Sequence, residues 1–316
     1  MRTNVGSENS TKSTSDTAFA VLGNDTRMEI LRILGESTRP MSFSELRDRT
    51  GMRDPGQFNY HLNRLLGHFV DQTDNGYALR RSGERIVMAV LSGAVTDDPE
   101  LERTLTDLPC WYCGAPIEVS YRQERATAHC TRCEGAYGNT VGPDERSRLG
   151  YMYLPPAGVN GRTPGEIYLA ALTWRSRDIL AWANEICPYC SAPLENDVQL
   201  CEDHDAKDGL CEQCDRRYGV TFQSDCTNCI FSMNAMFAVY LLGHVDLRAF
   251  LLEHGFDPFA PTPDQYAALF PYEEEVRRTD PFEARFTFTV DGDQLTLVVD
   301  HDLNVVAVNV VTETSN

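Results

Sequence analysis

Residues 110–118 read CWYCGAPIE, and the chain repeats this phrase as CPYCSAPLE at residues 187–195. Another pair, CTRC at residues 130–133, follows the second cysteine of the first phrase, with sixteen residues between them. Two C-x-x-C pairs at this separation place four thiolates on a β-hairpin, a pattern typical of a structural zinc ribbon. A dithiol redox site would instead use one pair at a strand-to-helix junction. We therefore expect zinc to be bound by Cys110, Cys113, Cys130 and Cys133.

The second copy shares more than its cysteines with the first. Both copies carry Ala-Pro and Glu after the first pair, and both end in Tyr-Gly-x-Thr, at residues 137–140 and 218–221. This internal duplication predicts a second zinc ribbon, with Tyr137 and Tyr218 packed beneath the cysteines. The predicted ligands of the second ribbon are Cys187, Cys190, Cys211 and Cys214.

Four further side chains of metal-binding type lie in the second copy, namely Cys201, His204, Cys226 and Cys229. Together they would form a third site of the Cys₃His type. Alternatively, residues 226–229 form a buried pair of thiols, or share a metal ion with the second ribbon in another arrangement. The sequence leaves these alternatives open, so we expect two zinc ions, and a third only if this set binds one.

The composition is strongly acidic, with a formal net charge of -19, and only two of the 28 basic residues are lysine. A carboxylate-rich, lysine-poor surface is typical of salt-accumulating halophiles, although an acidic protein from a GC-rich genome would share it. A chain of 316 residues predicts more than one domain. The longest apolar stretch, residues 230–242, is shorter than the roughly 20 residues that span a bilayer. We expect a soluble, cytoplasmic protein whose eleven cysteines bind metal rather than form disulfides.

Residues 17–95 form a nearly neutral segment, with ten arginines against nine acidic residues, before a strongly acidic remainder. Residues 1–16 are polar and are expected to be disordered. Capping signals at Asn24, Ser42 and Asp54 predict three successive helices. An Asp-Asn-Gly turn then predicts a β-hairpin that returns over residues 77–79, and a last helix follows within residues 82–95.

The strings LGNDTRMEILRIL, FSELRDRTG and FNYHLNRLL, followed by this hairpin, resemble winged helix-turn-helix regulators of the ArsR type, particularly their haloarchaeal members. The resemblance implies that the third helix enters the major groove of DNA. The second helix contains no cysteine, so the thiolate sensor of metal-responsive relatives is absent there, and the loop after the third helix is one residue shorter than usual. The predicted DNA contacts are Gln57, Asn59, Tyr60, His61, Asn63 and Arg64 on the third helix, with Arg80 and Arg81 after the wing.

The rest of the chain alternates helices and strands, which predicts an α+β fold. Residues 163–166 form a capping box before a long helix, residues 231–243 and 246–255 predict two more helices, and residues 284–311 predict a three-stranded meander. We interpret DGD and DHD in that meander as turns rather than calcium ligands, because their spacing fits no calcium-binding loop. The predicted modules are the tail 1–16, the winged helix 17–95, the first ribbon 104–145, a strand and helix 146–186, the second ribbon 187–230, and the C-terminal module 231–316.

Functionally, the chain contains no motif of a catalytic nucleophile, phosphate loop or catalytic metal, so we do not expect an enzyme. The leading hypothesis is a sequence-specific transcription regulator with a zinc-stabilised acidic module that binds an effector, a partner or a second subunit. The alternatives are a basal factor resembling archaeal transcription factor E, which contacts polymerase, and a sensor of metal or oxidant. The helix within residues 82–95 either packs on the first helix or forms the seam of a homodimer.

Overall fold

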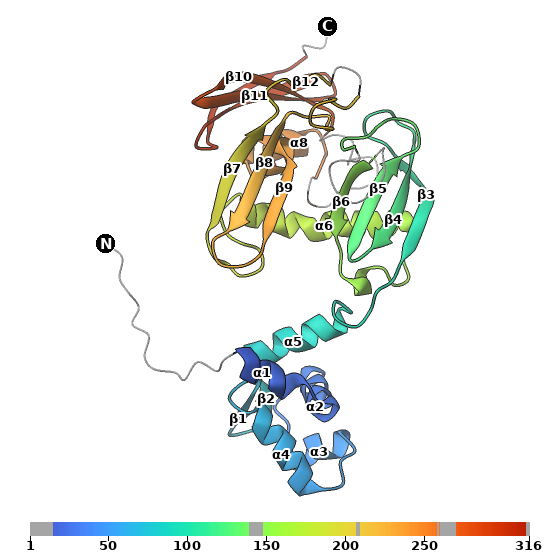
Figure 1. The fold of residues 1–316 in the computed structure, drawn as a ribbon, viewed down its shortest axis with the longest axis vertical. Helices are drawn as coiled ribbons and strands as arrows, with labels where there is room; N and C mark the ends of the chain where they lie inside the picture. Colours follow the sequence, from blue (N-terminus) through green and yellow to red (C-terminus); the bar gives the residue numbers. More distant parts are fainter. Residues whose placement is uncertain (1–14, 139–147, 207–208, 258, 260–269, 314–316) are drawn as a thin grey trace, which may run out of the picture. The chain divides into compact units, whose positions relative to one another are not determined.

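The computed structural model describes residues 15–138, 148–206, 209–257, 259 and 270–313 (Figure 1). The predicted disordered tail lies outside the described residues except at its last two positions, where the first helix already begins at Ser15. The chain divides into two compact units, Met1–Asp97 and Asp98–Asn316, which we describe separately. No helix among the described residues is long and apolar enough to cross a membrane.

The N-terminal unit begins with four helices, and each predicted cap lies at the start of one. The Asn24 side chain accepts from the N–H of Arg27, Ser42 accepts from Glu45, and Asp54 accepts from the first turn of its helix. These caps satisfy backbone donors that have no partner inside a helix. The helices are α1 (Ser15–Leu22), α2 (Asp25–Gly35), α3 (Phe43–Arg49) and α4 (Pro55–Leu65).

A two-stranded hairpin follows, formed by β1 (Val70–Thr73) and β2 (Gly76–Leu79). The turn requires glycine at position 76, where φ is 123° and an added Cβ would lie 2.3 Å from the carbonyl oxygen of Met41. This close approach allows Met41 and Tyr77 to exchange two backbone hydrogen bonds. The hairpin is thereby fixed to the segment that leads into α3.

The last helix of this unit, α5 (Arg81–Leu91), has one buried side and one exposed side. Val87 is buried and packs against Gly35 of α2. Met88 and Leu91 remain 55% and 59% exposed. One face of α5 therefore packs on α2, the first helix predicted from the sequence, whereas a second, apolar face remains exposed.

The described residues of the C-terminal unit form three antiparallel sheets (Figure 1). Each is a simple succession of neighbouring strands. The first sheet contains β3 (Leu101–Pro109), β4 (Pro116–Arg122), β5 (Arg125–Cys130) and β6 (Arg148–Tyr153). The second sheet contains β7 (Leu194–Leu200), β8 (Val220–Cys226) and β9 (Ser232–Met236). The third sheet contains β10 (Tyr272–Thr279), β11 (Phe282–Val290), β12 (Asp293–Asp300) and β13 (Val305–Val311).

The long helix α6 (Pro164–Trp182) joins the first two sheets. Its N-terminus has the predicted capping box, in which Thr163 and Glu166 each bond to the other's backbone N–H. α6 contacts the strands of the first sheet, and Trp182 at its end packs on Phe222 of β8. Short helices η1 (Pro156–Gly158), α7 (Phe237–Leu241) and α8 (Val245–Glu253) complete the unit.

Two predictions for the C-terminal region were wrong in part. Residues 232–236, expected to begin a helix, form strand β9, because β8 offers them a free edge and Thr221–Asp225 pairs with them in register. The meander has a fourth strand, β10, which precedes the three predicted strands and pairs with β11. Its charged sequence YEEEVRRT gives no alternating apolar pattern, so periodicity could not reveal it.

Residues from all the predicted modules after residue 100 share one hydrophobic core. Within it, the ring of Tyr218 stacks on that of Tyr272 in β10, with centroids 4.0 Å apart. Next to this pair, the largely buried Glu274 carboxylate accepts from the N–H groups of Gly219 and Val220. The third sheet is thus attached to the start of β8 by one aromatic stack and one buried carboxyl group.

Glu274 makes the stability of this unit dependent on pH. Burial raises the pKa of its carboxyl group from 4.5 to about 7, although the two N–H donors act in the opposite direction. Because the pKa is higher in the folded state, the stabilisation is complete below about pH 4.5 and is lost as the pH rises through about 7. Over that pH range the unfolding free energy of the wild-type chain should fall by about 3 kcal/mol. We expect Glu274→Gln to lack this fall, because glutamine cannot ionise.

The measurement is denaturant unfolding of the wild-type chain and the variant across this pH range. Glu273→Gln is the matched control, since Glu273 lies on the same strand and is exposed. Parallel pH curves for the wild type and Glu274→Gln would contradict the assignment.

Candidate functional site

Three C-x-x-C segments fold into the same tight knuckle, at residues 110–114, 187–191 and 211–215. In each, the N–H of the fifth residue donates to the carbonyl of the first cysteine, at 2.8, 2.9 and 2.8 Å respectively. The fifth residue adopts a left-handed conformation, with φ of 69° at Gly114, 62° at Ser191 and 53° at Asp215. This turn brings the two sulfur atoms of each knuckle close together, as a shared metal ion requires.

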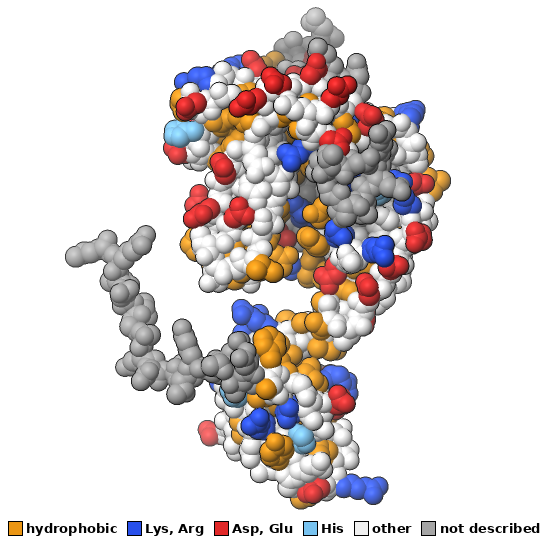
Figure 2. Space-filling view, in the orientation of Figure 1, with side chains coloured by type: hydrophobic (Ala, Val, Ile, Leu, Met, Phe, Trp, Pro, Cys, Tyr) orange, Lys and Arg blue, Asp and Glu red, His pale blue; other side chains and the backbone are white. Residues whose placement is uncertain are grey.

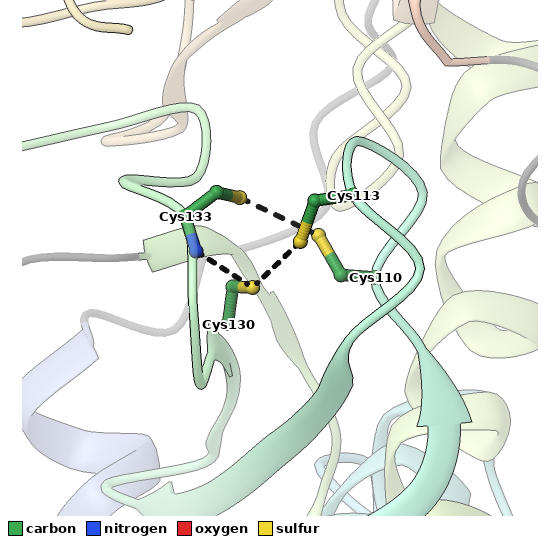
Figure 3. Close-up of side chains that lie close together, drawn as sticks. All are labelled: Cys110, Cys113, Cys130 and Cys133. Atoms are coloured by element: carbon green, nitrogen blue, oxygen red, sulfur yellow. Dashed lines mark hydrogen bonds between the residues drawn. The ribbon is translucent and has the colours of Figure 1, made fainter.

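The first cluster contains the four predicted ligands (Figure 3). Cys110 and Cys113 belong to the knuckle after β3, while Cys130 ends β5 and Cys133 follows it. The Sγ atoms of Cys113 and Cys130 are 3.4 Å apart, and those of Cys110 and Cys133 are 3.7 Å apart. The structure thus brings together the four cysteines that the sequence groups as one site.

The second cluster differs from the prediction, because Cys187 and Cys190 are joined by Cys226 and Cys229 instead of Cys211 and Cys214. Its Sγ separations, 3.4 Å for Cys190–Cys226 and 3.7 Å for Cys187–Cys229, repeat those of the first cluster. The physical reason is strand register. The closing pair must lie at the end of the returning strand, and β8 ends at Cys226 opposite Leu194, as β5 ends at Cys130 opposite Ile117.

The third cluster therefore contains Cys201, His204, Cys211 and Cys214. It lies in the insertion between β7 and β8, at the opposite end of the hairpin from the second cluster. The Nδ1 atom of His204 is 3.5 Å from the sulfur of Cys214, and its Nε2 atom is 3.1 Å from the carbonyl oxygen of Arg217. This carbonyl fixes the imidazole so that Nδ1 faces the thiols, the usual support for a metal-binding histidine.

The spacing of the ligand atoms fits a tetrahedral ion. Metal–sulfur bonds of about 2.3 Å in a tetrahedron require sulfur atoms about 3.8 Å apart. The separations above approach this value, and within each cluster all four ligand atoms lie within 4.8 Å of one another. The three donor sets, two of four cysteines and one of three cysteines with a histidine, are therefore compatible with metal binding.

A bound cation would help all the thiols of a cluster to ionise. Burial raises the pKa of Cys214 to about 12 and raises that of Cys110 further. The N–H of Ala192 lowers the pKa of Cys190 to about 6. Thiols this unequal do not all ionise together at neutral pH unless a metal ion neutralises their charge.

In the DHD turn, the potential ligand atoms of Asp300, His301 and Asp302 lie within 4.8 Å of one another. An Oδ1 atom of Asp300 accepts from the N–H groups of Asp302 and Asn304, both at 3.0 Å. His301 and Asp302 are exposed. The Asp300 carboxylate thus holds the turn, as interpreted from the sequence.

The polar face of α4 contains most of the residues predicted to contact DNA. Five of the six are exposed, namely Gln57, Asn59, Tyr60, Asn63 and Arg64. His61 is the exception, because it is only 8% exposed and lies in the core side of the helix. Desolvation, with the nearby charge of Arg27, lowers the pKa of His61. The prediction that His61 faces outward was wrong: a helix turns 100° per residue, so position 61 shares the buried side with Phe58, Leu62 and Leu65.

Arg80 and Arg81, the predicted DNA contacts after the wing, are exposed, and both interact with other residues of the N-terminal unit. Arg80 bonds to the carbonyl of Gly67 and lies 3.6 Å from the carboxylate of Asp71. Arg81 pairs with Glu84 at 2.7 Å. Both are surface ion pairs, which contribute little and exchange readily.

The fold and the three clusters define the class of protein: a mixed α+β chain with several antiparallel sheets and cysteine groups fit to bind metal ions. Residues 107–305, more than half of the chain, match the family described as Domain of unknown function (DUF7351), and the chain belongs to this family. Residues 15–90 match a second model, Domain of unknown function (DUF7347). Searches of curated proteins and of solved structures found no match.

The new pairing of cysteines predicts the metal content of double variants. Cys190→Ser with Cys226→Ser alters one cluster, so the purified protein should lose one bound metal ion relative to the wild type. Cys190→Ser with Cys211→Ser alters two clusters and should lose two. Elemental analysis of both variants measures this difference. A loss of two ions from the first variant and one from the second would instead support the pairing expected from the sequence.

Proposed function

We propose that this chain is a sequence-specific DNA-binding transcription regulator. In this proposal α3, α4 and the β1–β2 hairpin act as a winged helix-turn-helix, and α4 enters the major groove. The C-terminal unit holds zinc at its clusters and acts as the interaction or effector module.

The observation that carries the proposal is the exposed polar face of α4. Six arginines of the N-terminal unit form ion pairs with nearby carboxylates, including Arg32, Arg49 and Arg80. Within the described part of the chain, Arg64 has no such pair, and the side chains of Asn59 and Asn63 make no hydrogen bond. Asparagine amides can pair with adenine and a guanidinium with guanine, so this face carries available donors of the kind used to read bases.

The nearly neutral charge of the N-terminal unit favours DNA recognition through base contacts over recognition through phosphate contacts. Residues 17–95 are close to neutral, so counterion release contributes little affinity. At the high ionic strength expected for a halophile, about 1 M, the Debye length of about 3 Å would weaken phosphate contacts further. Direct contacts and the joining of two copies would then supply the specificity.

Zinc is the metal that the donor sets favour. Four thiolates, or three with an imidazole, in a closed tetrahedron leave no open position for a substrate. Such a site stabilises the fold rather than performing catalysis. The clusters would thus hold the hairpins of the C-terminal unit together.

We predict that Asn59→Ala and Arg64→Ala each weaken binding to the preferred duplex by about 1–3 kcal/mol, because one base contact is lost. The preferred sequence is first selected from random duplexes with the wild-type protein. Fluorescence anisotropy then compares this duplex with a scrambled one. Arg122→Ala, which removes an exposed arginine of the C-terminal unit, is the matched control.

Equal losses on the preferred and scrambled duplexes would show that α4 does not read bases. Sequencing of DNA recovered with the protein from cells separates the regulator from a basal factor. Occupancy of a few promoters supports the former, and occupancy of nearly all promoters supports the latter.

Dimerisation through α5 is part of the proposal. Met88 and Leu91 lie three positions apart on the exposed face of this helix, and burying each at a seam is worth about 1.5–3 kcal/mol. We predict that Met88→Glu with Leu91→Glu gives a monomer in analytical ultracentrifugation, with unchanged circular dichroism. Leu105→Glu, at an exposed site of the other unit, is the control. A monomeric wild-type protein would rule out this seam.

A further inference from the structure

The C-terminal unit contains a cavity of about 880 Å³, in the size range of small-molecule sites. Strand β6 and helix α6 form one wall, and β9 with the segment before it forms the other. Figure 2 shows a hollow in this unit where hydrophobic and basic side chains meet. The described lining residues all belong to the C-terminal unit, and Cys229 is the one metal-ligand candidate among them.

The walls of the cavity are largely apolar, and aromatic rings dominate them. Trp182 and Phe231 stack with centroids 6.4 Å apart, and Tyr189 lies 5.4 Å from Phe231. Tyr151 and Tyr153 on β6 add two partly exposed rings. Such walls favour a ligand with a flat, apolar body.

Three arginines also line the cavity, Arg148, Arg175 and Arg216, whereas Asp178 is the one acidic residue among the described lining. Asp178 pairs with Arg177 at 3.1 Å, and burial raises its pKa, whereas Arg177 and Arg175 act in the opposite direction. This lining is positive in a chain whose net charge is -19.

The guanidinium groups of Arg175 and Arg216 have weak partners. Arg175 lies over the Trp182 ring, 4.8 Å from its centroid, and donates to the thioether sulfur of Met233. Arg216 donates to the hydroxyl of Thr221 at 3.3 Å, and its Nε atom is buried without a hydrogen-bond partner. Within the described residues neither guanidinium forms an ion pair with a carboxylate, although Asp178, three positions after Arg175 on α6, interacts with the charge of Arg175. A half-buried guanidinium without a paired counter-ion is costly.

We infer that the cavity binds a small aromatic anion, with its ring among the aromatic walls and its acidic group against Arg175 and Arg216. Planar guanidinium groups bind carboxylates or sulfonates through paired hydrogen bonds, which suits this role better than lysine would. The inference is independent of DNA binding, because it concerns the C-terminal unit alone.

The test is fluorescence titration of the full-length, metal-loaded protein with anilinonaphthalene sulfonate, an aromatic anion. N-phenylnaphthylamine, which has the same rings without the sulfonate, is the matched neutral probe. We expect the anion to bind with one site per chain and at least about tenfold more tightly than the neutral probe. Arg175→Gln and Arg216→Gln should each weaken the anion about tenfold and leave the neutral probe unchanged.

Arg122→Gln is the control, since Arg122 is exposed and lies outside the cavity lining. Met233→Trp, which fills the cavity from β9, should weaken both probes and so locate their binding. Metal content and near-ultraviolet circular dichroism verify that each variant is folded. Equal affinity for the two probes, or anion binding that neither arginine variant changes, would overturn the inference.

Discussion

The crowding of sulfur atoms at the three cysteine clusters is the constraint on which the C-terminal unit depends. In the first cluster, Sγ atoms 3.4 and 3.7 Å apart bring together four thiols, and burial raises the pKa of Cys110 and of Cys133. The second cluster repeats these separations. A bound cation would resolve this conflict, because it would favour the thiolates and fix their positions together. Cys110, Cys130 and Cys187 are also part of the hydrophobic core, so the clusters and the core stabilise each other.

The sequence predicted what local chemistry determines. Asn24, Ser42, Asp54 and Thr163 cap helices where expected, since a cap needs only its own first turn. The cysteine pairs at residues 110–113 and 130–133 lie together, as the sequence groups them, because a short hairpin joins them.

The sequence was less informative where the outcome depends on register or on packing between distant segments. The similarity of Tyr-Gly-x-Thr in the two copies suggested Cys211 and Cys214 for the second cluster. The position of the returning strand decides instead for Cys226 and Cys229. Likewise, the helical orientation of His61 and the pairing of residues 232–236 with β8 follow from neighbours that periodicity does not reveal. A strand ending at a cysteine, as β5 and β8 both do, is the signal that would have corrected the pairing.

The distribution of arginine connects the acidic composition with the interior of the C-terminal unit. Arg175 lies over Trp182, Arg177 over Trp174 and Arg217 over Tyr112, so aromatic faces hold several guanidinium groups. A guanidinium is weakly hydrated and stacks on rings, whereas an ammonium group retains its water. Positive charge can therefore be kept against an apolar wall while carboxylates remain at the surface. Because stacking is less screened by salt than an exposed ion pair, this arrangement would preserve an arginine-lined cavity at high ionic strength.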